Sequence, residues 1–332
     1  MTESRSKIAI VLLQFGGPDS LEAVEPFLLN LFSDPDIFEL PFGAKFQTFV
    51  AQQISKRRAP SVREKYAEIG GKSPIVERTE EQVRALQQYF DAKHASLGVT
   101  VRLAGRYWKP FTADTMSALV HDGVQEVILL PLYAQYAVAN AGSSFNEWDR
   151  ELARQHAAFR ERRVREYYKN EKYLEAINTR IEEGLAQFPN PKDVLLLFSA
   201  HGTPLDMVKR GDPYSAQIRE TMELVMDMRG HDHEYLLSFQ SKVGPKRWLK
   251  PSTHDMLIKL GARGVTDMLV IPIAFVSDHI ETLHELDIEE RKTAEASGIT
   301  NYRVMKGLNA HPLFIECLAD VALKEIEALR HE

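Results

Sequence analysis

Short apolar runs recur along the chain, and they are typical of strands buried on both faces of a parallel sheet. Segments with helical periodicity lie between these runs. Strands that alternate with helices predict an α/β fold with parallel sheets. The predicted strands are Ile8–Leu13, Val99–Leu103, Val127–Leu132, Val194–Phe198, Tyr235–Phe239 and Met268–Phe275, and the predicted helices include Leu21–Phe32, Glu80–His94, Tyr173–Phe188, Ser215–Met228 and Pro312–Leu329.

The chain also repeats itself in three places that keep the same order. The segments 8–18 and 194–204 are both apolar strands that end in Gly-x-Pro. The segments 123–131 and 264–272 both carry a glycine and a proline at the same spacing, and a Trp precedes a proline in both Trp108-Lys-Pro and Trp248-Leu-Lys-Pro. Together these matches predict two similar lobes, residues 1–165 and 166–311, with a final helix over residues 312–332.

Composition and charge narrow the function classes. The chain has 332 residues and a net charge of −6, which does not favour a nucleic-acid partner. The charged stretch 150–172 is therefore interpreted as a solvated helix face. A single cysteine, Cys317, cannot form an intrachain disulfide and fits a reducing compartment. No apolar run reaches the ~20 residues that a membrane-spanning helix needs. We expect a cytoplasmic protein that can still touch a membrane surface.

Candidate chemistry lies after two strands of the second lobe. In open α/β sheets, ligands bind beyond the carboxyl ends of the strands, where the strand order reverses. The strand Val194–Phe198 is followed by His201, and the strand Met268–Phe275 leads into the acidic segment 278–289. If both strands are central, His201 and this segment meet at one crevice. His201 then suits proton transfer or metal ligation, although a hydrogen-bonded structural histidine is the alternative.

The acidic segment has a helical spacing of its own. If it is a helix, four carboxylates fall within an arc of about 80°, with apolar residues on the other side. Such a row predicts a path for a divalent cation, and the alternative is an amphipathic helix with a solvated acidic face. The four residues are Asp278, Glu281, Glu285 and Glu289.

Common catalytic motifs of other enzyme classes do not occur in the sequence. It has no G-x-S-x-G elbow, no phosphate-binding G-x-x-x-x-G-K-[ST] loop, no G-x-G-x-x-G fingerprint and no H-E-x-x-H zinc site. These absences argue against a hydrolase, a kinase and a dehydrogenase.

Several motifs in register resemble those of the ferrochelatases, the enzymes that insert Fe(II) into porphyrins. The resemblance runs from about Ile8 to the helix after Pro312. The motifs are Leu-Leu-Gln-Phe-Gly-Gly-Pro at 12–18, Tyr-Ala-Glu-Ile-Gly-Gly-Lys-Ser-Pro at 66–74, Arg-Tyr at 106–107, Gly-Ser-Ser-Phe-Asn at 142–146, Phe-Ser-Ala-His-Gly at 198–202, Arg-Gly-Asp-Pro-Tyr at 210–214, Phe-Gln-Ser-Lys-Val-Gly-Pro at 239–245 and Ser-Asp-His-Ile-Glu-Thr-Leu at 277–283.

The resemblance implies two Rossmann-like lobes without a nucleotide, as in class II chelatases. A porphyrin would lie in a cleft between the lobes, and the C-terminal helix would pack back on the first lobe. His201 and Glu281 would be the catalytic and metal-site pair, and an acidic path would continue through Asp278, His279, Glu285 and Glu289. The residues implied to contact the macrocycle or its propionates are Phe15, Arg57, Arg58, Tyr66, Ser73, Arg106, Tyr107 and Phe239.

Fe(II) would be a substrate, and no cofactor is expected. Many eukaryotic members of the family hold a [2Fe-2S] cluster in a Cys-rich extension, whereas this chain has only Cys317. Two alternatives stay open at this point. One is a chelatase for another metal such as cobalt, and the other is a haem or porphyrin carrier without catalysis.

Two finer expectations concern the substrate and the surface. In the resembling family, the motif Gln14-Phe15-Gly-Gly-Pro is the form associated with protoporphyrin IX, whereas enzymes that act on coproporphyrin III tend to carry a Tyr in place of Phe15. The segment 26–58 is rich in phenylalanine, and we expect part of it to form an apolar lip able to rest on a membrane. The residues of this lip are Phe38, Phe42, Phe46 and Phe49, and ordinary core packing is the alternative.

Overall fold

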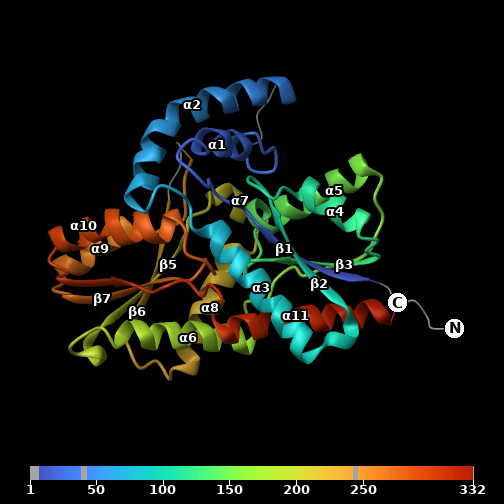
Figure 1. Cartoon of the computed structure of the whole chain (residues 1–332). Helices are drawn as coiled ribbons and strands as arrows, with labels where there is room; N and C mark the ends of the chain where they lie inside the picture. Colours follow the sequence, from blue (N-terminus) through green and yellow to red (C-terminus); the bar gives the residue numbers. More distant parts are fainter. Residues whose placement is uncertain (1–6, 39–42, 242–245, 332) are drawn as a thin grey trace. The chain divides into compact units, whose positions relative to one another are not determined.

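A computed structural model describes residues 7–38, 43–241 and 246–331. The chain forms two compact units. The first unit contains the chain up to Tyr133, the segment Ala137–Tyr167 and the chain from Phe314 onward; the second contains Ala134–Tyr136 and Tyr168–Leu313. Each unit has its own parallel sheet with helices around it (Figure 1), so the predicted α/β class is confirmed.

The first unit begins with a strand whose residues are all buried, and alternates strands with helices from there. Its C-terminal helix α11 is tied to the unit by an ion pair between Arg162 and Glu325, whose Nε and Oε2 atoms are 3.0 Å apart. The elements are β1 (Ile8–Gln14), α1 (Val24–Phe32), α2 (Ala44–Glu68), α3 (Ile75–Lys93), η1 (Ala95–Leu97), β2 (Val99–Gly105), α4 (Thr112–His121), β3 (Glu126–Pro131), the π-helix η2 (Val138–Gly142), α5 (Ser143–Gln155), β4 (Arg160–Arg163) and α11 (Pro312–Arg330).

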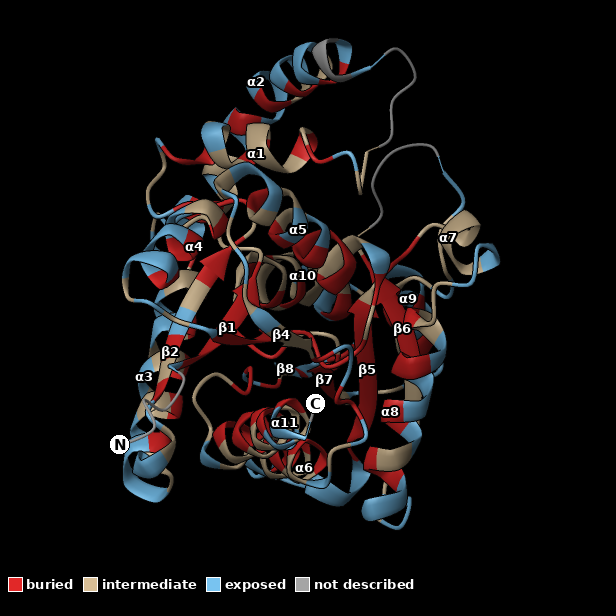
Figure 2. Ribbon diagram, turned by 90° about the vertical axis from the view of Figure 1, so that its right-hand side faces the viewer, coloured by how far each residue is buried: buried red, intermediate tan, exposed pale blue. Residues whose placement is uncertain are grey.

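The second unit follows the same alternation. Its central strands carry the apolar runs seen in the sequence, and they are drawn in red in Figure 2 because they are buried. The elements are α6 (Glu171–Leu185), η3 (Pro191–Asp193), β5 (Leu195–His201), α7 (Leu205–Lys209), α8 (Tyr214–Met228), β6 (Tyr235–Gln240), α9 (Thr253–Ala262), β7 (Asp267–Pro272), the π-helix η4 (Glu281–Glu289), α10 (Glu290–Ala296) and β8 (Asn301–Val304).

The two sheets have the same strand order. The first is ordered β2-β1-β3-β4 and the second β6-β5-β7-β8, and all neighbouring strands are parallel. The chain therefore leaves the central strand to one side and later returns to its other side. The switch point lies between β1 and β3 in the first unit, and between β5 and β7 in the second.

The repeats seen in the sequence occupy matching places in the two units. At the end of β2, the Gly105 N–H donates a hydrogen bond to the Pro110 carbonyl at 2.7 Å. Near the end of β6, the Phe239 N–H donates to the Pro251 carbonyl at 2.9 Å. Both prolines follow a cis peptide bond, and a helix, α4 or α9, begins shortly after each.

The charged stretch 150–172 is not one helix. Helix α5 ends at Gln155, and the segment Arg160–Arg163 forms the edge strand β4, paired in parallel with β3. The helix interpretation is wrong because pairing with a buried neighbour outweighs the polar composition. Charged residues are common on edge strands because they discourage further pairing, and here Arg160 Nη1 is 2.7 Å from the Glu126 carboxylate.

The core of the second unit fixes which side of η4 is exposed. Leu286 of η4 and Ala294 of α10 are fully buried in a cluster with residues of β5, β7 and α9. The Tyr302 hydroxyl of β8 also donates a hydrogen bond of 2.8 Å to the Leu286 carbonyl. With the apolar side of η4 held inward, its acidic side chains remain partly exposed.

Candidate active site

His201 is the last residue of the central strand β5, at the switch point of the second sheet. Its Nδ1 lies 2.6 Å from the Gly202 carbonyl oxygen. Because a carbonyl can only accept, Nδ1 carries the proton in the neutral ring and Nε2 keeps a lone pair. About a third of the His201 side chain is exposed. Its Nε2 is therefore able to accept a proton or to ligate a metal.

Glu281, the first residue of η4, lies between two imidazoles. Its Oε1 is 3.7 Å from His201 Nε2, and its Oε2 is 3.5 Å from His279 Nε2. The His279 Nδ1 also faces a carbonyl, that of Ser277 at 3.1 Å, and the His279 ring packs against Phe275. Both imidazoles thus direct Nε2 at one carboxylate, an arrangement that a proton or a divalent cation stabilises.

The pKa values of Glu281 and Glu285 are shifted in opposite directions. Burial raises the pKa of Glu281, but the positive charges that His201 and His279 carry when protonated outweigh it, so the pKa lies below its ordinary value. Burial and the negative charge of Glu281 raise the pKa of Glu285. A pair with separated pKa values can divide the ionised and protonated roles between its members. Glu285 is the member that takes up a proton first.

The remaining acidic residues do not form one continuous helical row. The helical backbone starts at Ile280, so Asp278 precedes it, and its carboxylate accepts hydrogen bonds from Gly307 and Asn309. Residues 281–289 form a π-helix rather than the expected α-helix. Because a π-helix has more than four residues per turn, residues four apart lie nearly above one another. Glu281, Glu285 and Glu289 therefore still share a face.

The site around His201 is open rather than a closed metal cage. Among residues 7–38, 43–241 and 246–331, no three His, Cys, Asp or Glu side chains are placed to hold a metal ion.

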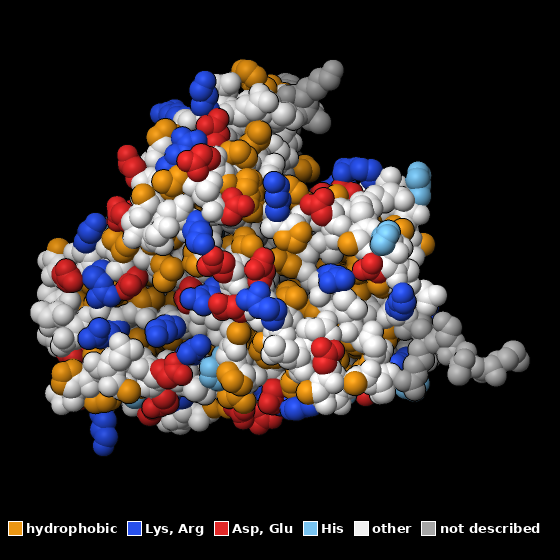
Figure 3. All heavy atoms as spheres, in the orientation of Figure 1, with side chains coloured by type: hydrophobic (Ala, Val, Ile, Leu, Met, Phe, Trp, Pro, Cys, Tyr) orange, Lys and Arg blue, Asp and Glu red, His pale blue; other side chains and the backbone are white. Residues whose placement is uncertain are grey.

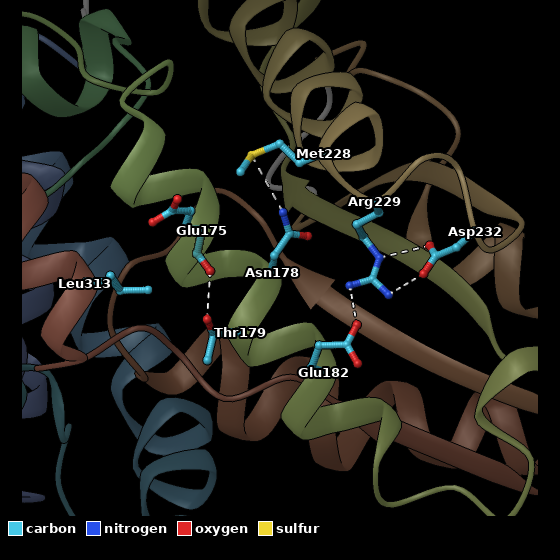
Figure 4. A pocket seen from close by; sticks show the side chains of 8 residues that line it. All are labelled: Glu175, Asn178, Thr179, Glu182, Met228, Arg229, Asp232 and Leu313. Carbon is cyan, nitrogen blue, oxygen red and sulfur yellow. Dashed lines mark hydrogen bonds and ion pairs between the residues drawn. The ribbon is translucent and has the colours of Figure 1, made fainter.

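A depression of about 460 Å³ elsewhere on the second unit is not this site. Figure 4 shows that its guanidinium, Arg229, is already held by Glu182 and Asp232. It contains none of the predicted site residues; its lining is Glu175, Asn178, Thr179, Glu182, Met228, Arg229, Asp232 and Leu313.

In the first unit, Phe15 directly follows the central strand β1 and is only partly buried. Its ring lies 5.4 Å from the Tyr107 ring and 4.9 Å from the Tyr133 ring, measured between centroids. The Gln14 Oε1 accepts hydrogen bonds from the Phe15 N–H and the Tyr133 hydroxyl, both at 2.9 Å. Phe15 is thus fixed from two sides.

Arg106 and Tyr107 are less accessible than the sequence suggests. The Arg106 Nη2 is 2.9 Å from Asp34 Oδ1, and Nη1 is 3.5 Å from Glu147 Oε2. Tyr107 is fully buried and its hydroxyl donates to the Asp34 carboxylate. A propionate would have to displace these carboxylates to reach Arg106. The backbone N–H groups of Arg106 and Tyr107 donate to the carbonyls of Gln14 and Phe15, both at 2.8 Å.

The other predicted contact residues are spread over the two units. Tyr66 and Ser73 are buried in the first unit, and the Ser73 N–H donates a 2.7 Å hydrogen bond to the Pro18 carbonyl. Arg57 and Arg58 are exposed on α2. Phe239 is buried at the end of β6 in the second unit.

Comparison with known proteins gives a consistent answer. Residues 7–326 match the model of the Ferrochelatase family. The chain is 47% identical to the ferrochelatase of Geotalea uraniireducens, over 97% of this chain and 99% of that protein. It is also 42% identical to the ferrochelatase of Trichodesmium erythraeum, over 97% of this chain and 84% of that one.

The chain belongs to the ferrochelatase family. The fold has a more distant counterpart in SirB from Bacillus subtilis, whose structure with Fe³⁺ superposes with a TM-score of 0.56 at 12% identity and covers 96% of this chain and 95% of that chain. A second SirB structure, a sirohydrochlorin chelatase with cobalt, gives a TM-score of 0.55 at 12% identity and covers 96% of this chain and 94% of that chain. At this identity the likeness shows the fold alone.

Two residues at the site of this family member were not singled out from the sequence. The Ser241 N–H and hydroxyl donate to the two Glu285 oxygens at 2.8 and 2.7 Å. Tyr214 is buried, and burial together with the charge of Glu281 raises its pKa well above the ordinary value. Both residues lie inside motifs shared with the family, and this was the only signal that pointed to them.

The buried carboxylate of Asp34 gives a prediction on stability. Burial alone raises its pKa, but Arg106 and the hydroxyls of Ser143 and Tyr107 hold the pKa below the ordinary 3.8. Asp34→Asn should therefore destabilise the protein near neutral pH by roughly 3 kcal/mol, because the buried Arg106 then keeps only its longer ion pair with Glu147.

The pH dependence of this loss follows from the lowered pKa. A depressed pKa stabilises the fold above 3.8, and this contribution disappears as the pH falls through the folded-state value. In urea unfolding, the gap between wild type and Asp34→Asn should shrink from about pH 7 to about pH 3. Asp36→Asn, which breaks the more exposed pair with Arg150, is the control and should cost about 1 kcal/mol or less. A gap that is constant with pH would contradict the assignment.

Proposed function

We propose that the protein inserts Fe(II) into a porphyrin and releases two protons. The observation that carries this proposal is the Glu281 carboxylate between the Nε2 atoms of His201 and His279, at the switch point of the second sheet. Membership of the ferrochelatase family supports the same reaction. A non-catalytic carrier would need apolar walls for the ring and would have no use for this cation-attracting group.

The chemistry assigns distinct tasks to these side chains. Two pyrrole nitrogens of the free porphyrin carry protons, so the metal can enter only when the ring bends and both protons leave. Bending the ring costs on the order of 1–5 kcal/mol, and the binding energy of contacts away from the reacting centre supplies it. His201 Nε2 accepts a pyrrole proton, and Glu281 stabilises the imidazolium that results. Glu285, with its raised pKa, takes the proton onward.

The first test removes the proposed proton acceptor. His201→Ala should lower kcat by roughly 10²–10⁴-fold, the usual contribution of a general base, while porphyrin binding persists. The measurement is an anaerobic assay with purified protein, Fe(II) and porphyrin, with binding followed by porphyrin fluorescence. His231→Ala, an exposed histidine of the same unit, is the matched control. Near-normal turnover of His201→Ala would refute this role.

The acidic face of η4 should show a gradient of importance. Glu281→Gln should reduce turnover severely, because Glu281 lies against His201. Glu289→Gln should have a mild effect, because Glu289 is at the far end of η4 and its side chain is 41% exposed. Steady-state kinetics with varied Fe(II) measure both variants. Equal losses at the two positions would contradict a path that ends at His201.

We propose protoporphyrin IX as the porphyrin. Phe15 presents an apolar ring where a tyrosine would offer an oxygen, and protoporphyrin IX has vinyl groups where coproporphyrin III has two further propionates. We expect a higher kcat/KM for protoporphyrin IX than for coproporphyrin III in parallel assays, and Phe15→Tyr should narrow this difference. A preference of the wild type for coproporphyrin III would overturn the choice of substrate and leave the metal insertion intact.

We also propose that the protein contacts membranes through the start of α2. Phe46 and Phe49 are 41% and 57% exposed, and Figure 3 shows apolar atoms at the surface at that end of the helix. Phe38 is partly buried against Phe32, and the predicted lip residue Phe42 lies outside the described residues. No helix of the described residues is long and apolar enough to cross a bilayer. Contact would therefore be peripheral.

The membrane proposal is tested by sedimentation with anionic lipid vesicles. The double variant Phe46→Ser and Phe49→Ser should lose binding, because apolar burial drives insertion of such a surface. Val120→Ser removes an apolar side chain that is 50% exposed elsewhere in the same unit, and it should bind like wild type. Unchanged binding of the double variant would refute the proposal.

A further inference from the structure

Asp278 lies at the start of the segment that carries His279 and Glu281, and its carboxylate is fully engaged with neutral groups. Its Oδ1 accepts the Gly307 N–H at 2.9 Å, and its Oδ2 accepts the Asn309 side-chain amide at 2.7 Å. The Thr282 hydroxyl lies 3.4 Å from Oδ1. In return, the Asp278 N–H donates to Asn309 Oδ1 at 3.0 Å. Asp278 and Asn309 are thus bonded in both directions.

The loop between β8 and α11 is shaped around this pair. Asn309 has a φ of 48°, in the left-handed region that asparagine tolerates better than most residues. Its N–H donates to the Val276 carbonyl at 2.8 Å. A Cβ on Gly307 would lie 2.8 Å from the Asp278 nitrogen and 3.0 Å from its Oδ1, so only glycine permits the approach. Two residues of one loop, Gly307 and Asn309, therefore fix the segment 276–278.

These contacts decide between two roles for Asp278. Asp278 precedes η4 and is off the face that Glu281, Glu285 and Glu289 share, and its two oxygens are bonded to the loop of residues 307 and 309 rather than directed along that face. A carboxylate that orients neighbouring residues needs such fixed bonds. We propose that Asp278 and Asn309 are a positioning pair that fixes His279 and Glu281, and that Asp278 is not a member of the acidic path. The proposal rests on the function proposed above.

An exchange of the two side chains tests the pair. Asp278→Asn alone loses a bond, because two amide groups then face each other. Asn309→Asp alone places two carboxylates in contact. Asp278→Asn combined with Asn309→Asp restores every bond, because the amide at 278 donates to the carboxylate at 309, which still accepts the N–H of residue 278. Asn and Asp have similar shapes, and both tolerate the left-handed region.

Each single variant should lower kcat and Co(II) affinity by roughly 10- to 100-fold, as is usual for residues that orient a metal-site ligand. The exchange should return both to within about twofold of wild type, the usual error of such cycles. Porphyrin KM should stay unchanged throughout. Gly307→Ala should resemble the single variants although every carboxylate is intact. Thermal unfolding of each variant separates a loss of fold from a loss of positioning.

A second Asp–Asn pair in the same unit provides the matched control. Asn301 donates to Asp267 at 2.8 Å, at the amino ends of β8 and β7, away from His201. Its single variants and its exchange should leave turnover and Co(II) affinity unchanged.

The proposal is overturned if the Asp278/Asn309 exchange folds like wild type but is as slow as Asp278→Asn, because the negative charge at residue 278 is then required. Failure of the proposed function is separately visible, because the wild type would then metallate no porphyrin. Hydrogen exchange of the amides of residues 279–285 still reports on the pair in that case. These amides should be less protected in both single variants and protected again in the exchange, and a lack of such recovery would count against the pair.

Discussion

The chemistry of the second unit depends on one carboxylate that faces two imidazole nitrogens. His201 and His279 each direct Nδ1 at a backbone carbonyl, so that both Nε2 atoms face Glu281. With both imidazoles neutral, their Nε2 lone pairs face one carboxylate, and protonation of either ring relieves this repulsion. The backbone carbonyls thereby set the tautomers that face Glu281.

Two levels of support keep Glu281 in this place. The buried Leu286 and the hydroxyl of Tyr302 hold η4 against the sheet, and this determines which face of the helix carries the carboxylates. Ser241 then fixes Glu285 with two hydrogen bonds, from a backbone with a φ of 63°. Ser241 thereby holds the Glu285 carboxylate in place, one helical turn after Glu281.

The sequence predicted those elements that a local pattern of apolar residues determines. The apolar runs identified the four interior strands β1, β3, β5 and β7, because burial on both faces requires continuous hydrophobicity, and they also identified the edge strands β2 and β6. The sequence was uninformative for the other two edge strands, β4 and β8, which are short and polar and form because a buried neighbour offers its hydrogen bonds. The spacing of the carboxylates showed that Glu281 and Glu285 share a face, but it could not distinguish a π-helix from an α-helix. Nor could it show that Asp34 holds Arg106, since these residues meet only in the folded chain.

The two units have the same strand order, yet they carry different side chains at equivalent positions. By the spacing of the repeats, Phe15 occupies in the first unit the position of His201 in the second, and Asn140 occupies that of Glu281. The same backbone plan therefore bears an aromatic ring and an amide in one half, and an imidazole and a carboxylate in the other. A parallel sheet with a switch point supplies a place for reactive side chains without prescribing which ones are used. In this chain, the side chains at these two positions leave one half uncharged and give the other half a pair of groups that can exchange protons.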